Sequence, residues 1–221
     1  MFRKAKKGET PATPDEFYEK REHMVSDLIT NGYLKTDRVI KVFLETPRHL
    51  FIVDKHQDFA YADYPVSIPS GQTISAPHMV ALMTELLEPK AQDKVLEIGA
   101  GSGYQAAILA KLVKKVYTVE VDHDLTVFAR ENLQKAGIDN VEVMQGDGAL
   151  GYPKKGPYDK IIVTCATPEI FDAWINQLKK GGLLVAPVGS GFYQELVSIR
   201  KVKKGFERTA YGLCAFVPLR R

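Results

Sequence analysis

The segment that most constrains the fold is an apolar run that passes directly into closely spaced glycines and then into an amphipathic stretch. Residues 95–98 have the pattern of a buried strand, and Gly99, Gly101 and Gly103 follow at alternate positions. Glycine allows a sharp turn and lets a ligand approach backbone that a Cβ would screen. The free N–H groups at the start of the following helix face such a ligand. We therefore predict a loop that cradles a cofactor containing a ribose.

The glycine spacing narrows the choice of cofactor. Tyr104 stands where a dinucleotide-binding loop usually has its third glycine, which favours S-adenosylmethionine over NAD or FAD. Glu120 ends the next predicted strand, at the spacing that brings a carboxylate beside ribose hydroxyls. The sequence therefore indicates a nucleoside-containing methyl donor.

A further carboxylate follows at the next predicted strand end. Asp147 lies between Gly146 and Gly148, where an adenine amino group could be bound. Each feature also has a plain structural interpretation: a tight strand-to-helix connection, solvated strand-end carboxylates at Glu97 and Glu120, and an ordinary Asp-Gly turn. Ligands bind beyond the carboxyl ends of parallel strands, where all three acidic residues converge, and this favours a cofactor site.

Strand and helix patterns alternate through the middle of the chain. The predicted strands are 94–98, 116–120, 141–145, 158–164 and 183–188, and the predicted helices are 103–113, 124–136 and 169–180. Residues 194–200 and 206–219 then give two or three extended strands without helices. This order predicts a Rossmann-like α/β fold, with a mostly parallel twisted sheet, helices on both faces and an antiparallel C-terminal edge.

Extra helices precede this core. One begins at the capping pattern Thr13-Pro14-Asp15-Glu16, another covers 37–46 before Pro47, and a third passes through 79–87. Residues 54–76 have no sustained period and predict a long ordered loop, which is often functional. We expect a disordered basic tail (1–13) and one methyltransferase domain (14–221). Its parts are the N-terminal helices and covering loop (14–92), the cofactor-binding core (93–190) and the C-terminal strands (191–221).

The charge distribution argues against a protein that binds nucleic acid. Lys and Arg number 30 and Asp and Glu number 27, but Arg3, Lys4, Lys6 and Lys7 stand within the first seven residues. Without these four, 26 basic side chains face 27 acidic ones, whereas a protein that grips phosphate backbones has a basic footprint. We expect no nucleic-acid partner.

The cysteine spacing and the lengths of the apolar runs restrict the class of protein further. Cys165 and Cys214 lack the spacing of a disulfide framework or a metal site, so we expect small buried residues and no metal. The apolar run 183–188 is too short to cross a bilayer, and the polar N-terminus lacks the apolar core of a signal peptide. We expect a cytoplasmic monomer without a membrane partner.

A second motif carries a family resemblance. The segment Gly71-Gln72-Thr73-Ile74-Ser75-Ala76-Pro77-His78-Met79, in register with the glycine loop, resembles the protein-L-isoaspartate O-methyltransferases. The similarity spans about residues 17 to 219. It also includes Pro47-Arg48, Gly146-Asp147-Gly148, Pro157-Tyr158-Asp159, Leu178-Lys179-Lys180-Gly181-Gly182, Pro187-Val188-Gly189 and Phe216-Val217-Pro218-Leu219.

The resemblance implies an enzyme that starts the repair of damaged proteins. Its members transfer the methyl group of S-adenosylmethionine to the free α-carboxylate of L-isoaspartyl residues in proteins and flexible peptides, leaving S-adenosylhomocysteine. The ester then collapses to a succinimide without enzyme help. By the same resemblance Ser75 is the catalytic residue. The implied cofactor residues are Gln72, Thr73, Ile74, Ser75, Glu97, Gly99, Gly101, Gly103, Glu120, Asp147 and Gly148, and the implied substrate residues are Ser75, Ala76, His78, Val217, Pro218 and Leu219.

The chemistry suits such a site. An α-carboxyl group has a pKa of about 3.3–3.7 and is already ionised at neutral pH, so no general base is required. Alignment of oxygen, methyl carbon and sulfur can lower a barrier by about 7–11 kcal/mol, and exclusion of water favours the meeting of anion and sulfonium. We expect residues 54–76 to cover the cofactor and the Ser75 hydroxyl to orient the carboxylate.

Local patterns leave alternatives open. Ser75 before Ala76-Pro77 also fits a helix N-cap, and His78 fits a surface residue of the first turn better than a catalytic base. Trp174, Phe59, Tyr61 and Tyr64 are interpreted as packing residues and loop anchors.

Two other functions remain as alternatives. A methyltransferase for nucleic acids or small molecules shares the cofactor half but carries an Asn/Asp-Pro-Pro-aromatic motif that this chain lacks. A non-catalytic S-adenosylmethionine-binding or dinucleotide-dependent protein is a more distant alternative.

The chain departs from the family pattern in three places. Residues 1–13 have no family counterpart, Val80 replaces a second histidine of some relatives, and other members continue past Arg221.

Overall fold

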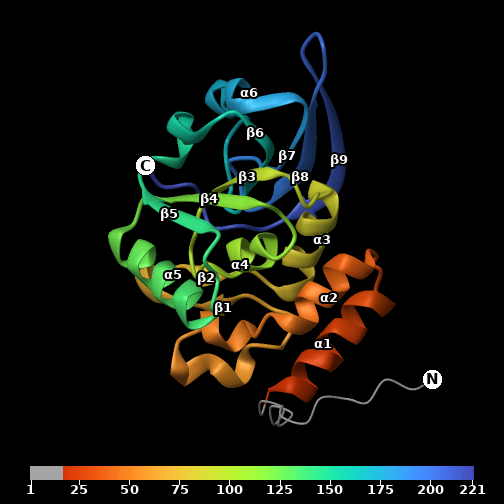
Figure 1. Ribbon diagram of the computed structural model, residues 1–221, viewed down its shortest axis with the longest axis vertical. Helices are drawn as coiled ribbons and strands as arrows, with labels where there is room; N and C mark the ends of the chain where they lie inside the picture. The colour runs from red at the N-terminus through yellow and green to blue at the C-terminus, as the bar shows by residue number, and fades with distance from the viewer. Residues whose placement is uncertain (1–16) are drawn as a thin grey trace, which may run out of the picture.

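Parallel strands form the middle of the molecule in the computed structural model, which describes residues 17–221 (Figure 1). Its main sheet has seven strands in the spatial order β5-β4-β3-β6-β7-β8-β9. These strands are β3 (Lys94–Ile98), β4 (Lys115–Glu120), β5 (Val141–Gln145), β6 (Tyr158–Val163), β7 (Leu178–Val188), β8 (Gln194–Lys201) and β9 (Phe206–Cys214). The pairs from β5 to β7 are parallel, while β8 and β9 are antiparallel additions at one edge. The expected Rossmann-like sheet with an antiparallel C-terminal edge is confirmed.

Helices cover both faces of this sheet. The helices are α1 (Tyr18–Thr30), α2 (Asp37–Glu45), α3 (Pro77–Leu87), α4 (Tyr104–Ala110), α5 (His123–Lys135) and α6 (Asp172–Gln177). In Figure 1, α4 and α5 lie below the sheet with α1 and α2 beyond them, and α6 lies above it. Two apolar clusters correspond to these layers: Val95 and Val116 pack towards the larger helical layer, and Leu96 and Ile161 pack on the side of Trp174 in α6.

The central strands are apolar on both faces because both faces are covered. All four residues after Lys94 in β3 are buried, as are five of the six residues of β6. Strands of this kind read as continuous apolar runs instead of alternating ones, which is why their positions are predictable from sequence. One consequence is that a charged side chain within them, such as Glu97, is placed in an apolar setting.

The segment 54–76, predicted as a long ordered loop without a sustained period, contains short regular elements. The segment contains 3-10 helices at Asp54–Phe59 and Pro69–Gly71, and β1 (Val66–Ser67) pairs antiparallel with β2 (Thr73–Ile74). Val66, Ile68 and Ile74 are buried, so tertiary packing stabilises elements that are too short to show a period. The segment is ordered, as expected.

The predicted helix 169–180 is also too long. Helix α6 ends at Gln177, and β7 begins at Leu178, which pairs with Tyr158 of β6 and is almost fully buried. The register of this pair shifts between Tyr158 and Lys160, and Gly181 has a positive φ of 76° in the extra segment. Burial of Leu178 against the sheet therefore outweighs the local helical pattern. Helix α4 is shorter than predicted too and ends at Ala110.

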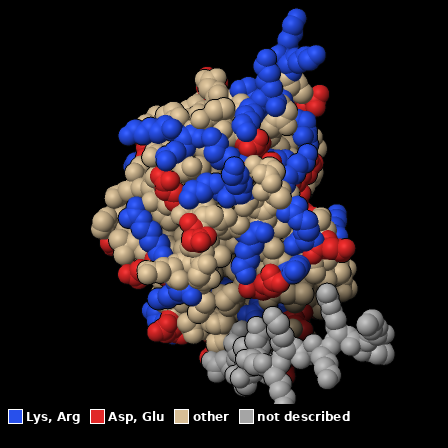
Figure 2. Space-filling view, viewed as in Figure 1, with Lys and Arg blue, Asp and Glu red and all other residues tan. Residues whose placement is uncertain are grey.

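Other expectations concern the chain ends and the surface. The predicted helix start at Thr13 and the tail 1–13 lie outside the described residues, and α1 begins at Tyr18. Within residues 17–221, none of the helices combines the length and apolar character needed to cross a membrane. Figure 2 shows Lys and Arg side chains with Asp and Glu between them on the face seen in Figure 1.

Candidate active site

The glycine loop after β3 adopts backbone conformations that require glycine. Gly99, Gly101 and Gly103 all have positive φ, at 95°, 52° and 87°. A Cβ on Gly99 would lie 2.8 Å from Oγ1 of Thr164, and one on Gly103 would lie 3.2 Å from the carbonyl oxygen of Ala129. Gly101 is different, because a Cβ there would approach only Ile68, at 3.7 Å. The loop is thus packed at two glycines and open at the third.

The carboxylate of Glu120 holds this loop in place. Its Oε2 accepts a hydrogen bond from the Gly101 backbone N–H at 3.0 Å, and its Oε1 accepts one from the Asp122 N–H at 3.1 Å. Parallel pairing of β3 with β4 brings the two strand ends together. Glu120 is therefore positioned by backbone donors on both sides.

Glu97 is a buried carboxyl group without a hydrogen-bond partner. Its side chain is fully buried, and neither Oε1 nor Oε2 has a hydrogen-bond partner among the described residues. Burial disfavours the charged form and raises the pKa of Glu97 to about 8. The nearby Thr118 hydroxyl offsets part of this rise, and the Glu120 charge adds to it. An unpaired buried carboxyl group is costly, and a cationic ligand group beside it would relieve that cost.

These residues surround a first cavity at the carboxyl ends of the strands. It has about 830 Å³ of atom-free space, a volume that includes open solvent at its mouth. The predicted cofactor residues that line it are Gln72, Thr73, Ile74, Ser75, Glu97, Gly99, Gly101, Glu120 and Gly148. The lining also includes Arg220, so segments as far apart in the sequence as Gln72 and Arg220 meet in one cavity.

Two predicted cofactor residues lie outside this lining. Gly103 is the N-cap of α4 and packs on α5. Asp147 caps a 3-10 helix by accepting the Ala149 N–H at 2.9 Å, and its other oxygen contacts Arg221 Nε at 3.1 Å. The neighbouring Gly148 lines the cavity, and its carbonyl accepts the Trp174 indole N–H at 2.8 Å. The adenine role of Asp147 stays a prediction.

A second cavity adjoins the first. Both are lined by Thr73, Ser75, Thr164, Phe216 and Val217. The second also has Pro65, Ala76, His78, Met79, Leu213, Cys214 and Ala215 in its walls. Ser75 therefore stands on the wall shared by two adjoining cavities, as a group between two reactants would.

The Ser75 hydroxyl is free for a ligand. The N-cap of α3 is Ala76, with no side-chain cap hydrogen bond, so the capping alternative for Ser75 is wrong. The Ser75 hydroxyl makes no hydrogen bond to the residues that the structure describes, although the Ser75 backbone carbonyl accepts one from Arg48 Nη2 at 2.7 Å. The structure accordingly fixes the backbone of Ser75 and leaves its side chain without a structural partner.

Arg48 holds the backbone of Ser75, a contact that the reasoning on individual site residues missed. It is fully buried, donates from Nε to the Ala60 carbonyl at 2.7 Å as well as to Ser75, and lies over the Tyr104 ring at 4.9 Å. Burial lowers the pKa of Arg48 to about 10, which leaves it charged at neutral pH. The only sequence signal was its place in the Pro47-Arg48 dipeptide of the family resemblance.

The predicted substrate residues divide between the two cavities. Ala76 and His78 line the second cavity, Val217 lines both, and Pro218 and Leu219 line the first. The His78 ring contacts Asp63 at 2.9 Å through Nδ1, and the Asp63 carboxylate also accepts the His78 backbone N–H. His78 is thus a partly buried residue in the wall of the second cavity, held by Asp63, and its substrate role stays a prediction.

The last residues of the chain join the site from the other side. Arg220 lines the first cavity and contacts Asp122 Oδ2 at 3.2 Å, while Ser70 donates to Asp122 Oδ1 at 3.0 Å. One carboxylate thus holds the segment before Gln72 and the C-terminal segment together. Neither contact could be inferred from the sequence, because nothing local marks their distant partner.

The remaining aromatic and cysteine residues named from the sequence lie in different settings. Trp174 is fully buried, Tyr61 bonds to His49 at 2.8 Å, and Cys165 and Cys214 are buried free thiols. Phe59 and Tyr64 are about half exposed, with ring centroids 6.4 Å apart. No group of three or more His, Cys, Asp or Glu side chains within residues 17–221 is arranged to hold a metal ion.

The fold and the site together define a class of protein. A mostly parallel sheet with a glycine loop, an acidic residue bonded to that loop and a cavity at the strand ends is characteristic of the Rossmann-like methyltransferases. The family model for protein-L-isoaspartate(D-aspartate) O-methyltransferase matches residues 19–221. The chain belongs to this family.

Individual relatives agree with this assignment. A protein-L-isoaspartate O-methyltransferase from Methanopyrus kandleri is 50% identical over 92% of both chains, and one from Pyrococcus horikoshii is 47% identical over 92% of this chain and 94% of that one. A solved structure from Plasmodium falciparum, in complex with S-adenosyl-L-homocysteine, has a TM-score of 0.80 at 27% identity and covers 90% and 98% of the two chains. A solved structure of a protein-L-isoaspartate O-methyltransferase has a TM-score of 0.82 at 29% identity, and the match covers 90% of this chain and 65% of the solved one.

Proposed function

We propose that this chain transfers the methyl group of S-adenosylmethionine to the free α-carboxylate of L-isoaspartyl residues in damaged proteins and peptides, and so begins their repair. The observation that carries the proposal is the position of Ser75 between the two cavities. The first cavity has the features of a methyl-donor site, and the second opens on the same hydroxyl. Membership of the family supplies the substrate class.

The first cavity suits the methyl donor in three ways. The unpaired buried carboxyl of Glu97 matches the ammonium group of the donor's amino acid. Glu120, fixed by the Gly101 N–H, is placed for ribose hydroxyls at the strand end. Gly101 leaves its backbone open to the cavity. The donor, when bound, supplies an electrophilic methyl group on a sulfonium.

The role of the protein is to position the carboxylate and the methyl donor and to exclude water. An isoaspartyl α-carboxylate is ionised at neutral pH, so the residues of the second cavity need only bind it as an anion. The Ser75 hydroxyl donates a hydrogen bond to one carboxylate oxygen and leaves the other directed at the first cavity. Residues 72–75 border this junction, residues 216–219 cover it with apolar side chains, and removal of water strengthens the attraction between anion and sulfonium.

Several predictions from sequence belong to this proposal. The division into a tail (1–13) and one methyltransferase domain (14–221) stays a prediction, as do the individual site roles. We expect the enzyme to act as a monomer in the cytoplasm, without a nucleic-acid or membrane partner. Its substrates are expected to be flexible peptides and exposed segments of damaged proteins.

The test is methylation of matched peptides with a donor carrying a labelled methyl group. One peptide contains an L-isoaspartyl residue and the other the normal aspartyl residue at the same position. Label is expected in a base-labile ester of the isoaspartyl peptide alone. Equal labelling of both peptides would contradict isoaspartyl selectivity. Label in RNA, DNA or small molecules, with neither peptide modified, would favour the alternative of a nucleic-acid or small-molecule methyltransferase.

A further inference from the structure

An exposed aromatic turn lies next to the second cavity. The turn between β7 and β8 carries Phe192, which is 92% exposed, and Tyr193, which is 65% exposed, with ring centroids 6.3 Å apart. Leu213 of β9 is 74% exposed and lines the cavity itself. Single exposed apolar residues are normal, but a contiguous group beside a cavity marks a binding surface.

One buried side chain ties this turn to the cavity wall. Gln194 is 2% exposed, its Nε2 donates to the Gly191 carbonyl at 2.8 Å, and its Oε1 accepts the Phe216 N–H at 2.8 Å. Gln194 also pairs with Cys214 across β8 and β9, and both Cys214 and Phe216 line the second cavity. The position of the aromatic turn is therefore coupled to the wall of the cavity.

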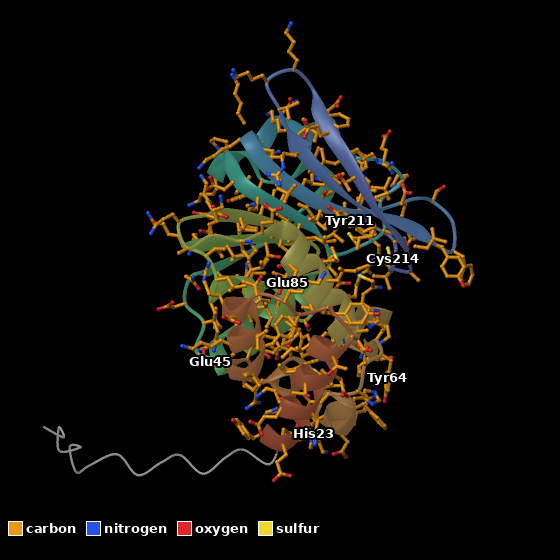
Figure 3. The ribbon with its side chains drawn as sticks, turned by 90° about the vertical axis from the view of Figure 1, so that its right-hand side faces the viewer. His23, Glu45, Tyr64, Glu85, Tyr211 and Cys214 are labelled. Atoms are coloured by element: carbon orange, nitrogen blue, oxygen red, sulfur yellow. The ribbon has the colours of Figure 1, made fainter. Side chains whose placement is uncertain are left out.

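The opposite wall carries an exposed aromatic residue as well. Tyr64 is 45% exposed and immediately precedes Pro65, which lines the second cavity. Figure 3 shows Tyr64 and Cys214 on the same side of the molecule, although they come from segments 150 residues apart. We refer to Tyr64, Phe192, Tyr193 and Leu213 as the aromatic rim.

Two charged residues that adjoin the rim in register or in sequence, Glu195 and Asp63, have partners. Glu195, which lies opposite Leu213 in the β8–β9 register, forms an ion pair with Arg208. Asp63, next to Tyr64, is held by His78. The rim therefore offers apolar and aromatic surface, and it suits an apolar side chain better than a charged one.

We infer that the aromatic rim binds an apolar side chain close in sequence to the isoaspartyl residue of the substrate. The inference rests on the proposed function, because it takes the second cavity as the site of the isoaspartyl residue. Leu213 of the rim and Ser75 line the same cavity, and an extended chain advances about 3.3 Å per residue. The side chain that meets the rim while the carboxylate lies at Ser75 therefore belongs to a residue near the isoaspartyl residue in sequence.

The rim thereby selects the state of the substrate as well as its sequence. Large apolar side chains are mostly buried in folded proteins, so an isoaspartyl residue with an accessible Phe or Leu beside it occurs mainly in unfolded or locally unfolded segments. The enzyme prefers damage in such segments over damage at polar surface loops.

The test compares KM values for three isoaspartyl peptides of equal length, all lacking other apolar residues. One has serine on both sides of the isoaspartyl residue, one has phenylalanine at the two preceding positions, and one has phenylalanine at the two following positions. Partial burial of one ring predicts a KM about tenfold lower for at least one Phe peptide. The double variant Phe192→Ser, Tyr193→Ser is expected to abolish this preference.

The matched control is Phe206→Ser, which removes a 52% exposed aromatic residue at the other end of β9. It is expected to keep the tenfold preference. Equal KM values for the three peptides with the native enzyme, or loss of the preference in the control, would overturn the inference. So would sedimentation showing that the native chain is a dimer and the double variant a monomer, because a second copy would then cover the rim. Failure to methylate any isoaspartyl peptide would contradict the proposed function itself.

Discussion

Arg48 Nη2 donates a hydrogen bond of 2.7 Å to the backbone carbonyl of Ser75, and Nε of the same guanidinium donates to the carbonyl of Ala60. The two carbonyls stand 15 residues apart in the segment that covers both cavities. One buried side chain thus joins the beginning of this segment to the proposed catalytic residue. The planar fork of arginine can bond two acceptors at once, which an ammonium group cannot do in the same geometry.

Replacement of Arg48 by lysine should therefore displace Ser75 without emptying the site. We expect kcat to fall by about tenfold or more, because misplacement of about 1 Å can cost a hundredfold. The free energy of unfolding should fall by about 1–3 kcal/mol, as one buried carbonyl loses its partner. The kcat is measured by steady-state kinetics and expressed per donor-binding site, and the free energy of unfolding is measured by urea denaturation.

The matched control for this variant is Arg38→Lys. Arg38 Nη2 also donates to a backbone carbonyl, that of Leu112, and neither residue lines either cavity. An unchanged kcat per binding site in Arg48→Lys, or an equal loss in Arg38→Lys, would show that Arg48 does not position Ser75.

Removal of the Ser75 hydroxyl should affect turnover and not folding. Because the hydroxyl has no hydrogen bond to a described residue, Ser75→Ala is expected to leave the melting temperature nearly unchanged. A hydrogen bond to a charged group contributes about 1.5–3 kcal/mol, so kcat/KM should fall by about tenfold to a hundredfold. Ser75→Thr keeps a hydroxyl and is expected to retain more activity than alanine. Native turnover in Ser75→Ala would remove the catalytic assignment.

Truncation of Glu120 should weaken binding of the methyl donor. Glu120→Ala removes the proposed ribose partner and the acceptor of the Gly101 N–H together, and we expect a loss of about 1–3 kcal/mol in binding free energy by calorimetry. Glu120→Gln retains one oxygen that can accept the Gly101 N–H, so its loss should be smaller. Identical affinities in the native protein and in Glu120→Ala would rule out the ribose role.

The high pKa of Glu97 predicts a pH dependence of donor binding. With a pKa of about 8, Glu97 is mostly protonated at pH 7 in the free protein, whereas an ammonium group beside it favours the ionised form. Binding must then release a proton, so affinity should rise up to about tenfold per pH unit below pH 8 and level off above it.

The measurement is calorimetry at pH 7 in two buffers with different heats of ionisation. Release of nearly one proton is expected in the native protein, and none in Glu97→Gln, which should also bind more weakly and without this pH dependence. Absence of proton release in the native protein would contradict the role given to Glu97.

The central elements of the fold were predictable because their signals are local. Strand β3 lies at the predicted position, since a strand buried on both faces is a continuous apolar run. Strand β5 at the sheet edge also lies where it was predicted, although only Val143 in it is buried. Gly99 and Gly101 were recognisable because positive φ and close ligand approach exclude other residues. Helix α6 was predicted too long, because pairing of Leu178 with Tyr158 depends on a strand that lies elsewhere in the chain.

The sequence by itself determined the Rossmann-like core, the glycine loop and Glu120, together with the resemblance carried by residues 71–79. Only the tertiary structure decided that Arg48 holds Ser75, that Asp122 joins Ser70 to Arg220, and that an aromatic rim borders the second cavity. The physical reason is that the types of a few neighbouring residues determine local backbone conformation and the pattern of burial. Hydrogen bonds and cavities instead join segments whose separation in the chain has no periodic signature.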